Sequence, residues 1–213
     1  MSLNLSQWKR PDTGALFVVS GASGTGKTTL LREALGRVPD IGFSVSATTR
    51  RPRPGERDGV DYHFLDPDRF QALVEQGAFL EWAEVYGNRY GTLRAPVEEA
   101  LLRGESIILD IDVQGARQVR EAMPECVSIF LAPTSITVLE QRLRARGTES
   151  EDTVATRMGL VQEQLDACGE FQYIVVNDVL ESAHDCLQAV LISELQRVGR
   201  RQSVVRGLVS AEK

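Results

Sequence analysis

A run of eight residues near the start of the chain constrains its fold more than any other feature. Residues 21–28 read Gly-Ala-Ser-Gly-Thr-Gly-Lys-Thr and match GxxxxGK[ST]. The run follows an apolar, β-branched segment, Ala15 to Ser20, and opens a segment from Lys27 to Leu35 with apolar residues at helical spacing, before Gly36 as a stop. The sequence therefore predicts a strand, a phosphate-binding loop and a helix. The alternative interpretation is a chance glycine-rich turn.

The loop residues are the candidates for binding ATP: Gly21, Ala22, Ser23, Gly24, Thr25, Gly26, Lys27 and Thr28. Lys27 can reach the β- and γ-phosphates, and the Thr28 hydroxyl can take one position on Mg²⁺. A carboxylate from the end of a neighbouring strand should complete the metal site, and Asp110 supplies it, with Asp112 on the same face of an extended chain. The alternative is that both carboxylates cap a helix that begins at Gln114.

Composition narrows the class of protein. The chain has 213 residues, 42% hydrophobic and 25% charged, which fits one globular domain with insertions. A net charge of −6 disfavours a general nucleic-acid binder, and the apolar runs are shorter than the roughly 20 residues of a membrane span. The three cysteines lack metal or disulfide spacing, and no secretory leader is evident. We expect a cytoplasmic protein without nucleic-acid or membrane partners, and the sequence leaves a homo-oligomer open.

Three further apolar runs read as strands that are covered on both faces. They span Ser106–Ile111, Val127–Leu131 and Tyr173–Val176, and each precedes a helical pattern. Strands that alternate with helices predict an α/β fold with a parallel central sheet and right-handed crossovers. Punctuating residues mark three helices: one from Asp66-Pro67 to Gly77, one with Pro96 in its first turn that ends before Gly104, and one from about Ser182 to Gly199.

Two segments depart from this alternation and predict insertions. Phe43–Ala47, Val60–Phe64 and Phe79–Val85 alternate polar and apolar residues, and Gly87-Asn88 suits a hairpin turn. They indicate a small mixed sheet beside the core. The second segment, roughly Thr137 to Gly169, is polar, and a capping box at Thr148 and Glu151 predicts a helix in it. Its thin apolar content favours a segment that moves.

The first insertion carries a group of residues suited to a phosphate dianion. Arg50, Arg51 and Arg53 lie on a turn that follows a strand, and Tyr62 and Tyr90 lie on nearby strands. Guanidinium groups bind phosphate through paired hydrogen bonds, and tyrosine hydroxyls add neutral donors. A solvated basic turn is the alternative.

A carboxylate in the same insertion suits guanine. The N1–H and exocyclic amino group of guanine form a pair of donors, which Glu81 could accept, and Ser46 and Thr92 could donate to the carbonyl O6. A cross-strand salt bridge is the alternative role for Glu81.

Taken together, the motifs resemble those of the bacterial guanylate kinases in order and spacing, over roughly residues 15 to 198. They are the following segments: Gly21–Thr28, Ser44–Glu56, Gly59–Phe64, Glu81-Trp82, Gly87–Thr92, Leu109–Gly115 and Arg142–Thr148. The resemblance implies transfer of the γ-phosphate of Mg·ATP to GMP, which gives ADP and GDP.

The resemblance also implies a P-loop three-layer α/β fold with a small mixed α+β GMP-binding insertion and a helical lid. On this scheme residues 1–14 are a loose arm, residues 15–198 the kinase-like domain and residues 199–213 a tail. Within the domain, the core comprises residues 15–43, 93–136 and 170–198, the GMP-binding insertion residues 44–92, and the lid residues 137–169.

Site residues follow from the same resemblance. The GMP phosphate is held at the positions of Arg50, Arg53, Tyr62 and Tyr90, and the base is read at those of Ser46, Glu81, Thr92 and Asp112. The catalytic cations are Lys27, Arg50, Arg142, Arg146 and Arg157. Asn177 matches a position near the adenine, and Thr28 with Asp110 would hold the metal.

Small departures and two competing functions remain. Thr28 replaces a common serine, Ala22 a common proline, and Arg51 adds a charge beside Arg50, so either of these neighbours could contact phosphate. A guanylate-kinase-like binding module would have lost the loop lysine or glycines, which are present here. A kinase acting on a ribose phosphate would have no use for Glu81.

Overall fold

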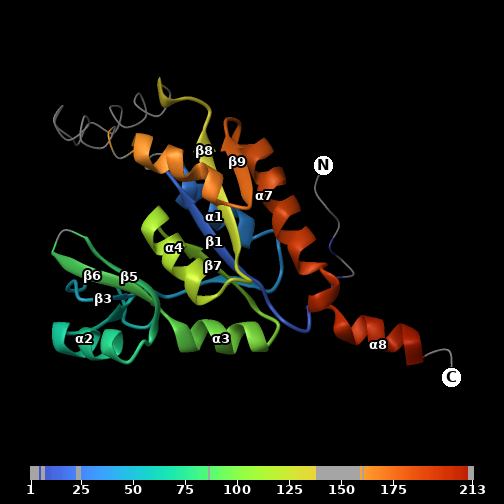
Figure 1. Cartoon of the computed structure of the whole chain (residues 1–213), viewed down its shortest axis with the longest axis horizontal. Coiled ribbons are helices and arrows are strands. Elements are labelled where there is room, and N and C mark those ends of the chain that lie inside the picture. Colours follow the sequence, from blue (N-terminus) through green and yellow to red (C-terminus); the bar gives the residue numbers. More distant parts are fainter. Residues whose placement is uncertain are drawn as a thin grey trace.

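Two sheets organise the chain (Figure 1). The computed structural model describes residues 5, 8–22, 25–85, 87–137, 159 and 161–210. The larger sheet has five parallel strands in the order β2-β7-β1-β8-β9. Its strands are β1 (Leu16–Gly21), β2 (Ile41–Phe43), β7 (Ser106–Asp110), β8 (Val127–Pro133) and β9 (Tyr173–Asn177).

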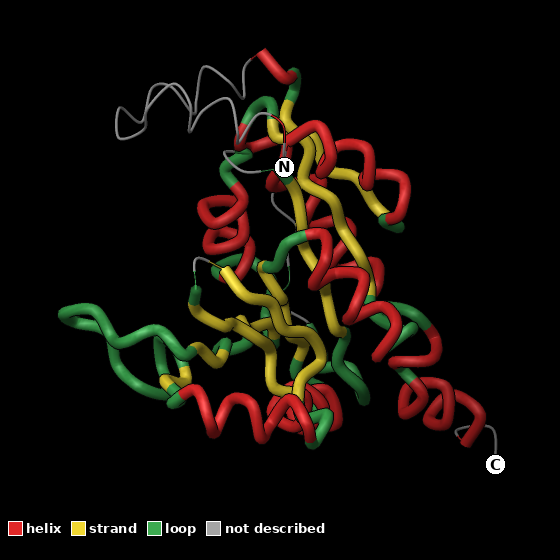
Figure 2. The backbone as a smooth tube through the Cα atoms, turned by 60° about the vertical axis from the view of Figure 1, so that its left-hand side comes forward, coloured by secondary structure: helices red, strands yellow, loops and turns green. Residues whose placement is uncertain are grey.

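The side chains of β1 sort into two cores because successive residues of a strand point to opposite faces. Phe17 and Val19 pack with helices α1 (Lys27–Leu35) and α7 (Leu180–Leu195). Leu16 and Val18 pack with α3 (Arg94–Leu102) and α4 (Val113–Ala122) on the other face. A sheet between two helical layers confirms the expected three-layer α/β architecture, and Figure 2 shows the helices flanking the strands.

Helix ends follow the punctuation in the sequence. Gly36 caps the end of α1, and Asp66 caps the start of α2 (Pro67–Glu75), with its Oδ1 accepting from Arg69 N at 2.7 Å. The remaining elements that the structure bounds are η1 (Ala167–Glu170), η2 (Val198–Arg200) and α8 (Gln202–Ser210).

The smaller sheet belongs to the first insertion and has the order β4-β3-β6-β5. Its strands are β3 (Ala47–Thr48), β4 (His63–Phe64), β5 (Phe79–Val85) and β6 (Asn88–Leu93). β3 pairs parallel to β4 and antiparallel to β6, so the sheet is mixed, and Gly87 turns between β5 and β6 at φ 72°. A separate apolar cluster, in which Phe70 stacks on Phe79 at 4.5 Å, holds α2 against this sheet.

Several sequence-based boundaries are wrong. The alternating run Val60–Phe64 forms a strand only at His63–Phe64. The alternating run Phe43–Ala47 is not one strand, because Ile41–Phe43 pairs with β7 in the core sheet and Ala47–Thr48 pairs within the insertion. An alternating pattern cannot reveal that a chain leaves one sheet for another. The last core helix ends at Leu195 rather than Gly199, which lies in η2.

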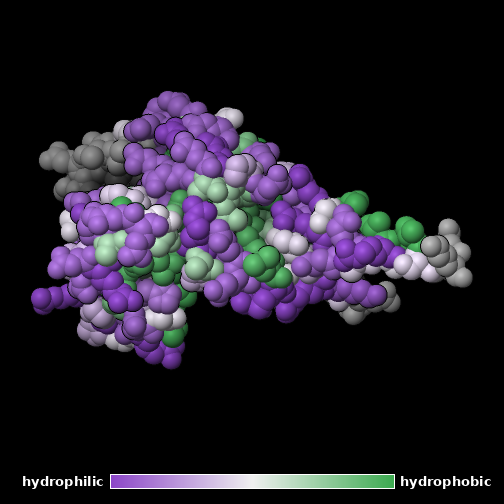
Figure 3. All heavy atoms as spheres, turned by 60° about the horizontal axis from the view of Figure 1, so that its bottom comes forward, coloured by the Kyte–Doolittle hydropathy of each residue, from purple (hydrophilic) through white to green (hydrophobic). Residues whose placement is uncertain are grey.

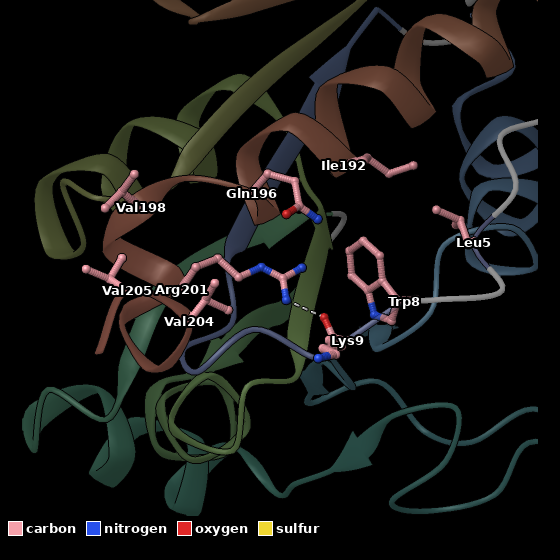
Figure 4. Close-up of a pocket in the computed structure, with 9 residues that line it drawn as sticks. All are labelled: Leu5, Trp8, Lys9, Ile192, Gln196, Val198, Arg201, Val204 and Val205. Carbon is pink, nitrogen blue, oxygen red and sulfur yellow. Dashed lines mark hydrogen bonds between the residues drawn. The ribbon is translucent and has the colours of Figure 1, made fainter. Parts of the chain in front are cut away.

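The residues around Trp8 pack against the core, whereas the sequence suggests a loose arm. Trp8 Nε1 donates to Asp40 Oδ2 at 3.0 Å, and Arg10 Nε donates to Asp40 Oδ1 at 2.8 Å. Asp12 N donates to the carbonyl of Arg200 at 2.9 Å. These contacts join the start of the described chain to Asp40, just before β2, and to η2. Figure 4 shows a further hydrogen bond, from Arg201 to the Lys9 carbonyl.

Helix α8 projects from this end of the molecule, where the sequence suggests an unstructured tail (Figure 1). It exposes Val204, Leu208 and Val209, which are 48%, 70% and 69% accessible, and Figure 3 shows apolar side chains gathered on the projection. At its base, a cavity of about 510 Å³ is lined by apolar side chains together with Lys9, Gln196 and Arg201. No helix in the described part of the chain has both the length and the apolar character to cross a membrane.

An ion-pair cluster joins η1 to α4. Glu170 Oε1 lies 2.5 Å from Arg117 Nη2, and Glu170 Oε2 lies 2.8 Å from Arg120 Nη2. Hydrogen bonds from Arg117, and then from Arg120, lower the pKa of Glu170 to about 2. The cluster therefore ties the segment that precedes β9 to the helix that follows β7.

We predict that Glu170→Gln lowers the free energy of unfolding at pH 7 by at most about 1 kcal/mol, because solvent screens pairs this exposed. The folded pKa, about 2, lies below the ordinary value of 4.5. The stabilisation is therefore present above pH 4.5 and lost as the pH falls towards 2. Urea denaturation at several pH values should show that the difference in unfolding free energy between the variant and wild type becomes smaller as the pH falls over that range. Glu121→Gln on α4, the helix that carries Arg117 and Arg120, is the control, and a difference independent of pH would contradict the assignment.

Candidate functional site

The phosphate loop is shaped by close approaches of neighbouring main chain and side chain. A Cβ atom on Gly21 would lie 2.3 Å from the carbonyl oxygen of Leu131 in β8, so only glycine fits there. Gly26 caps the start of α1 at φ 83°, a left-handed conformation, and a Cβ on it would lie 2.8 Å from Asn177 Nδ2. The sequence motif thus coincides with positions where a side chain is excluded.

Asn177, at the end of β9, braces this loop. Its side chain is 5% exposed, and Nδ2 donates to the Thr25 carbonyl oxygen at 2.6 Å. Thr25 in turn donates from Oγ1 to the Ala22 carbonyl at 2.9 Å. The structure therefore gives Asn177 a contact with the loop itself, in addition to the position near adenine that the family resemblance implies.

Lys27 and Asp110 form an ion pair in front of the loop. Lys27 Nζ lies 3.1 Å from Asp110 Oδ1, and both side chains are partly accessible, at 19% and 30%. They line a pocket of about 440 Å³ together with Gly26, Thr28 and Asp112. The pocket combines a cation, a hydroxyl and carboxylates at a helix N-terminus, which is the chemistry expected around a phosphate–metal complex.

A second pocket, of about 260 Å³, adjoins the first. Thr28, Asp110 and Ile111 line both of them, so the two cavities share a wall. Ser46, Tyr62 and Thr92 of the insertion line the second pocket. The core and the insertion thus both line the second pocket, and the core residues connect it to the first.

Arg50 is the centre of a polar and aromatic cluster at one end of the insertion. Its Nη2 donates to Glu56 Oε1 at 2.8 Å, and its guanidinium carbon lies 5.3 Å from the Tyr62 ring centroid. Tyr62 and Tyr90 meet edge to face at 6.2 Å. The hydrogen bond between Arg50 and Glu56 raises the pKa of Arg50 and lowers the pKa of Glu56, so both side chains stay charged.

The structure distinguishes Arg50 from its neighbours in the turn. Arg50 is partly buried in the cluster, whereas Arg51 and Arg53 are exposed. The main-chain N–H of Arg53 donates to Glu56 Oε2 at 2.7 Å, so Glu56 holds both ends of the turn. Of the three arginines, Arg50 is therefore the one whose side-chain orientation is fixed by the fold.

Glu81 is a buried carboxylate on β5, only 7% exposed. Its Oε1 accepts from Thr92 Oγ1 at 2.7 Å, across the β5–β6 pair. Burial raises the pKa of Glu81, the hydrogen bond from Thr92 opposes that rise, and the charge of Asp112 adds to it. No cation pairs with Glu81 among the described residues, so the cross-strand salt-bridge interpretation finds no support there.

The two carboxylates that follow β7 have different roles. Asp112 caps α4, with its Oδ1 accepting from Gly115 N at 2.8 Å, while Asp110 pairs with Lys27. The capping alternative is thus correct for Asp112, although α4 begins at Val113 rather than Gln114. Asp112 lines the loop pocket rather than the second pocket.

Most of the expected site residues gather around the two pockets, but some lie elsewhere. The expected residues that line neither pocket are Arg50, Arg53, Glu81, Tyr90 and Asn177, although Glu81 reaches the second pocket through Thr92 and Asn177 contacts the loop through Thr25. Ser23, Gly24, Arg142, Arg146 and Arg157 lie outside the described residues.

Sequence reasoning missed two charged residues that line the second pocket, Arg32 and Asp61. Arg32 lies four residues after Thr28 on α1, so helical spacing from the loop motif could have identified it. Asp61 accepts from Arg57 N at 2.7 Å in an exposed turn, and no sequence signal places it there.

Comparisons with known proteins agree on one family. The guanylate kinase family model matches residues 13–194. The guanylate kinase of Carboxydothermus hydrogenoformans is 49% identical over 181 residues, covering 85% of this chain and 89% of that protein. That of Parasynechococcus marenigrum is 52% identical over 170 residues, covering 80% and 93%. The crystal structure of guanylate kinase from Anaplasma phagocytophilum superposes with a TM-score of 0.70 at 32% identity, covering 89% and 90%.

We predict that Asn177→Ala weakens ATP binding about tenfold, because the Thr25 carbonyl would lose its buried donor and the loop its brace. The loss should be the same for ATP and GTP as phosphoryl donors, since the contact acts through the loop rather than through the base. Kinetic titration of both donors measures it. A loss confined to ATP would mean that Asn177 acts on the adenine alone, and Asp178→Ala is the neighbouring control.

Proposed function

The chain belongs to the guanylate kinase family, whose members phosphorylate GMP to GDP with ATP, and we propose that the two adjoining pockets are where this chain does so. On this proposal the loop pocket takes ATP and the second pocket takes GMP. The substrates are small molecules of the cytoplasm, where we place the enzyme.

The shared wall of Thr28, Asp110 and Ile111 is the observation that carries this assignment. Phosphoryl transfer has little covalent chemistry for the protein to perform, so it depends on placing donor and acceptor phosphates in line. Two pockets that share one wall supply such a place. A binding module would need only one of them.

On the donor side, the loop N–H groups and Lys27 bind the ATP phosphates. Lys27 is held at 3.1 Å by Asp110, so its ammonium already lies at the mouth of the pocket. We propose that the incoming phosphates replace Asp110 as the partner of Lys27. The exchange keeps the lysine paired throughout and leaves the carboxylate able to face a metal ion.

Thr28 and Asp110 fit Mg²⁺, because both are hard oxygen donors on the same wall. Among the described residues no group of three or more His, Cys, Asp or Glu side chains could hold a metal. Mg²⁺ normally takes few protein ligands and completes its shell with phosphate oxygens and water. Thr28 and Asp110 would hold the ion, which would supply positive charge to neutralise the phosphates of ATP.

On the acceptor side, the Arg50 cluster binds the phosphate of GMP. Arg50 with Tyr62 and Tyr90 offers a fixed guanidinium and two hydroxyls, and Arg53 lies on the same turn. Glu56 orients Arg50 and would remain its partner on one side while phosphate takes the other. An oxygen of the GMP phosphate then attacks the γ-phosphorus of ATP, and the bond to the β–γ bridging oxygen breaks to leave ADP.

Glu81 reads the base from beside the acceptor pocket, which it adjoins through Thr92. A carboxylate that burial makes reluctant to ionise gains most from two N–H donors, which guanine supplies at N1 and the 2-amino group. Thr92 donates to Glu81 and thereby orients it, so the hydroxyl contact with O6 falls to Ser46 in our proposal. Adenine would leave the carboxylate buried without these donors.

Lys27→Ala should lower kcat by about three orders of magnitude, because it removes a cation that faces the transferring phosphoryl group. The melting temperature should change little, since Lys27 and Asp110 are both partly exposed. A coupled assay and thermal denaturation measure the two effects. Arg37→Ala, beyond the end of the same helix, is the control. A folded variant with near wild-type kcat would sink the donor-site assignment.

The wild-type enzyme should prefer GMP to AMP by several orders of magnitude in kcat/KM, because AMP leaves Glu81 unpaired. Glu81→Gln should reduce kcat/KM for GMP at least a hundredfold and leave the KM for ATP unchanged. Glu84→Gln, an exposed carboxylate on the same strand, is the matched control. If Glu81→Gln behaves like the control, Glu81 does not read the base.

A further inference from the structure

Strand β5 lies at the edge of the insertion sheet, and a side chain of the core takes the place of a further strand beside it. The sheet order β4-β3-β6-β5 leaves one edge of β5 without a paired strand. There, Trp82 N donates to Gln118 Oε1 at 3.1 Å, and Gln118 Nε2 donates to the Trp82 carbonyl at 3.1 Å. One carboxamide thus satisfies both main-chain groups of the residue that follows Glu81.

The pair of hydrogen bonds determines the orientation of the amide. A flipped carboxamide would set its NH₂ against the Trp82 N–H and its oxygen against the Trp82 carbonyl, so both bonds would be lost. Trp82 presents its N–H and C=O side by side, as a strand presents them to a neighbouring strand. Gln118 therefore forms the pair of main-chain hydrogen bonds that a neighbouring strand would form. It fixes the position of β5 both along the strand and perpendicular to it.

A second residue of α4 limits the position of the Glu81 carboxylate. A Cβ atom on Gly115 would lie 3.0 Å from Glu81 Oε2, closer than a methyl group normally packs. Gly115 and Gln118 are three residues apart and so lie on the same face of α4. One helix face therefore contacts both the carboxylate of Glu81 and the main chain of the next residue.

The same helix is continuous with the transfer site. Asp112 caps α4 two residues after Asp110, the partner of Lys27. Apolar packing strengthens the connection, because Leu80 of β5 is buried in the core cluster that contains Ala116 and Val119 of α4. The Arg50 cluster lies at the other end of the insertion sheet, around β3 and β4.

We propose that Gln118 is a positioning residue for acceptor-base recognition, which holds Glu81 in register with the phosphoryl-transfer site through the main chain of Trp82. The inference rests on the proposed role of Glu81. It assigns the base-reading end of the GMP site to α4 of the core, whereas the described contacts of the Arg50 cluster lie within the insertion.

Gln118→Met tests this by keeping the length of the side chain and removing both hydrogen bonds. The KM for GMP should rise about tenfold, as expected for one or two lost hydrogen bonds, with the KM for ATP within about twofold of wild type. The preference for GMP over IMP, which lacks the 2-amino group, should fall by a similar factor. Gln114→Met, an exposed position on the same helix, is the matched control and should change none of these values.

Gly115→Ala provides an independent perturbation, because it displaces the Glu81 carboxylate without altering Gln118. It should also raise the KM for GMP and lower the preference over IMP. Alanine favours a helix more than glycine does, so a loss of α4 is not expected to cause the effect. An unchanged KM for GMP in both Gln118→Met and Gly115→Ala would overturn the proposal.

A double-mutant cycle separates this inference from the function on which it rests. If Gln118 acts through Glu81, Gln118→Met should have little further effect on GMP kinetics in the Glu81→Gln background. Full additivity, or an equal loss for GMP and ATP, would show that Gln118 only stabilises the fold and would overturn the proposal. Unchanged GMP kinetics in Glu81→Gln alone would instead refute the role of Glu81.

Discussion

The contact between Gly21 and the Leu131 carbonyl is the constraint on which the site depends. A side chain on Gly21 would lie 2.3 Å from that oxygen, so β1 can end against β8 only with a glycine in this position. The chain then turns over the carboxyl end of the sheet and enters α1 through Gly26. Because Asn177 comes from the end of β9, the loop is held from β8 and β9, the two strands on that side of β1.

An acidic protein can build an anion site when each cation is held locally by a carboxylate. Lys27 pairs with Asp110, and Arg50 pairs with Glu56, although the net charge of the chain is −6. In both pairs the carboxylate fixes where the cation points. All four side chains are partly buried, so each pair holds its cation in one direction.

The acceptor side combines two kinds of support. The Arg50 cluster is held by contacts within the insertion, among Glu56, Tyr62 and Tyr90. Glu81, by contrast, sits between Thr92 of its own sheet and α4 of the core. Burying an ionised carboxylate costs free energy, and the pKa of Glu81 is raised for that reason. The surrounding donors and packing must therefore offset this cost. The two ends of the proposed GMP site therefore differ in what keeps them in place.

The sequence by itself determined the features that depend on neighbouring residues. The loop motif, the two apolar faces of β1 and the β5–β6 hairpin at Gly87 are local patterns, because glycine tolerance and strand alternation act over a few residues. The tertiary structure decided what depends on residues far apart. It placed the two ends of the run Phe43–Ala47 in different sheets. It also made Asp112 the N-cap of α4 and paired Asp110 with Lys27.

The same applies to the bracing side chains. Asn177 contacts Thr25 across 152 positions and Gln118 contacts Trp82 across 36, and no spacing rule connects such pairs. A side-chain amide that bonds to a main chain leaves no periodic signal, because any strand residue has the same N–H and C=O. Only the packing of α4 against β5, and of β9 beside the loop, decided which residues meet.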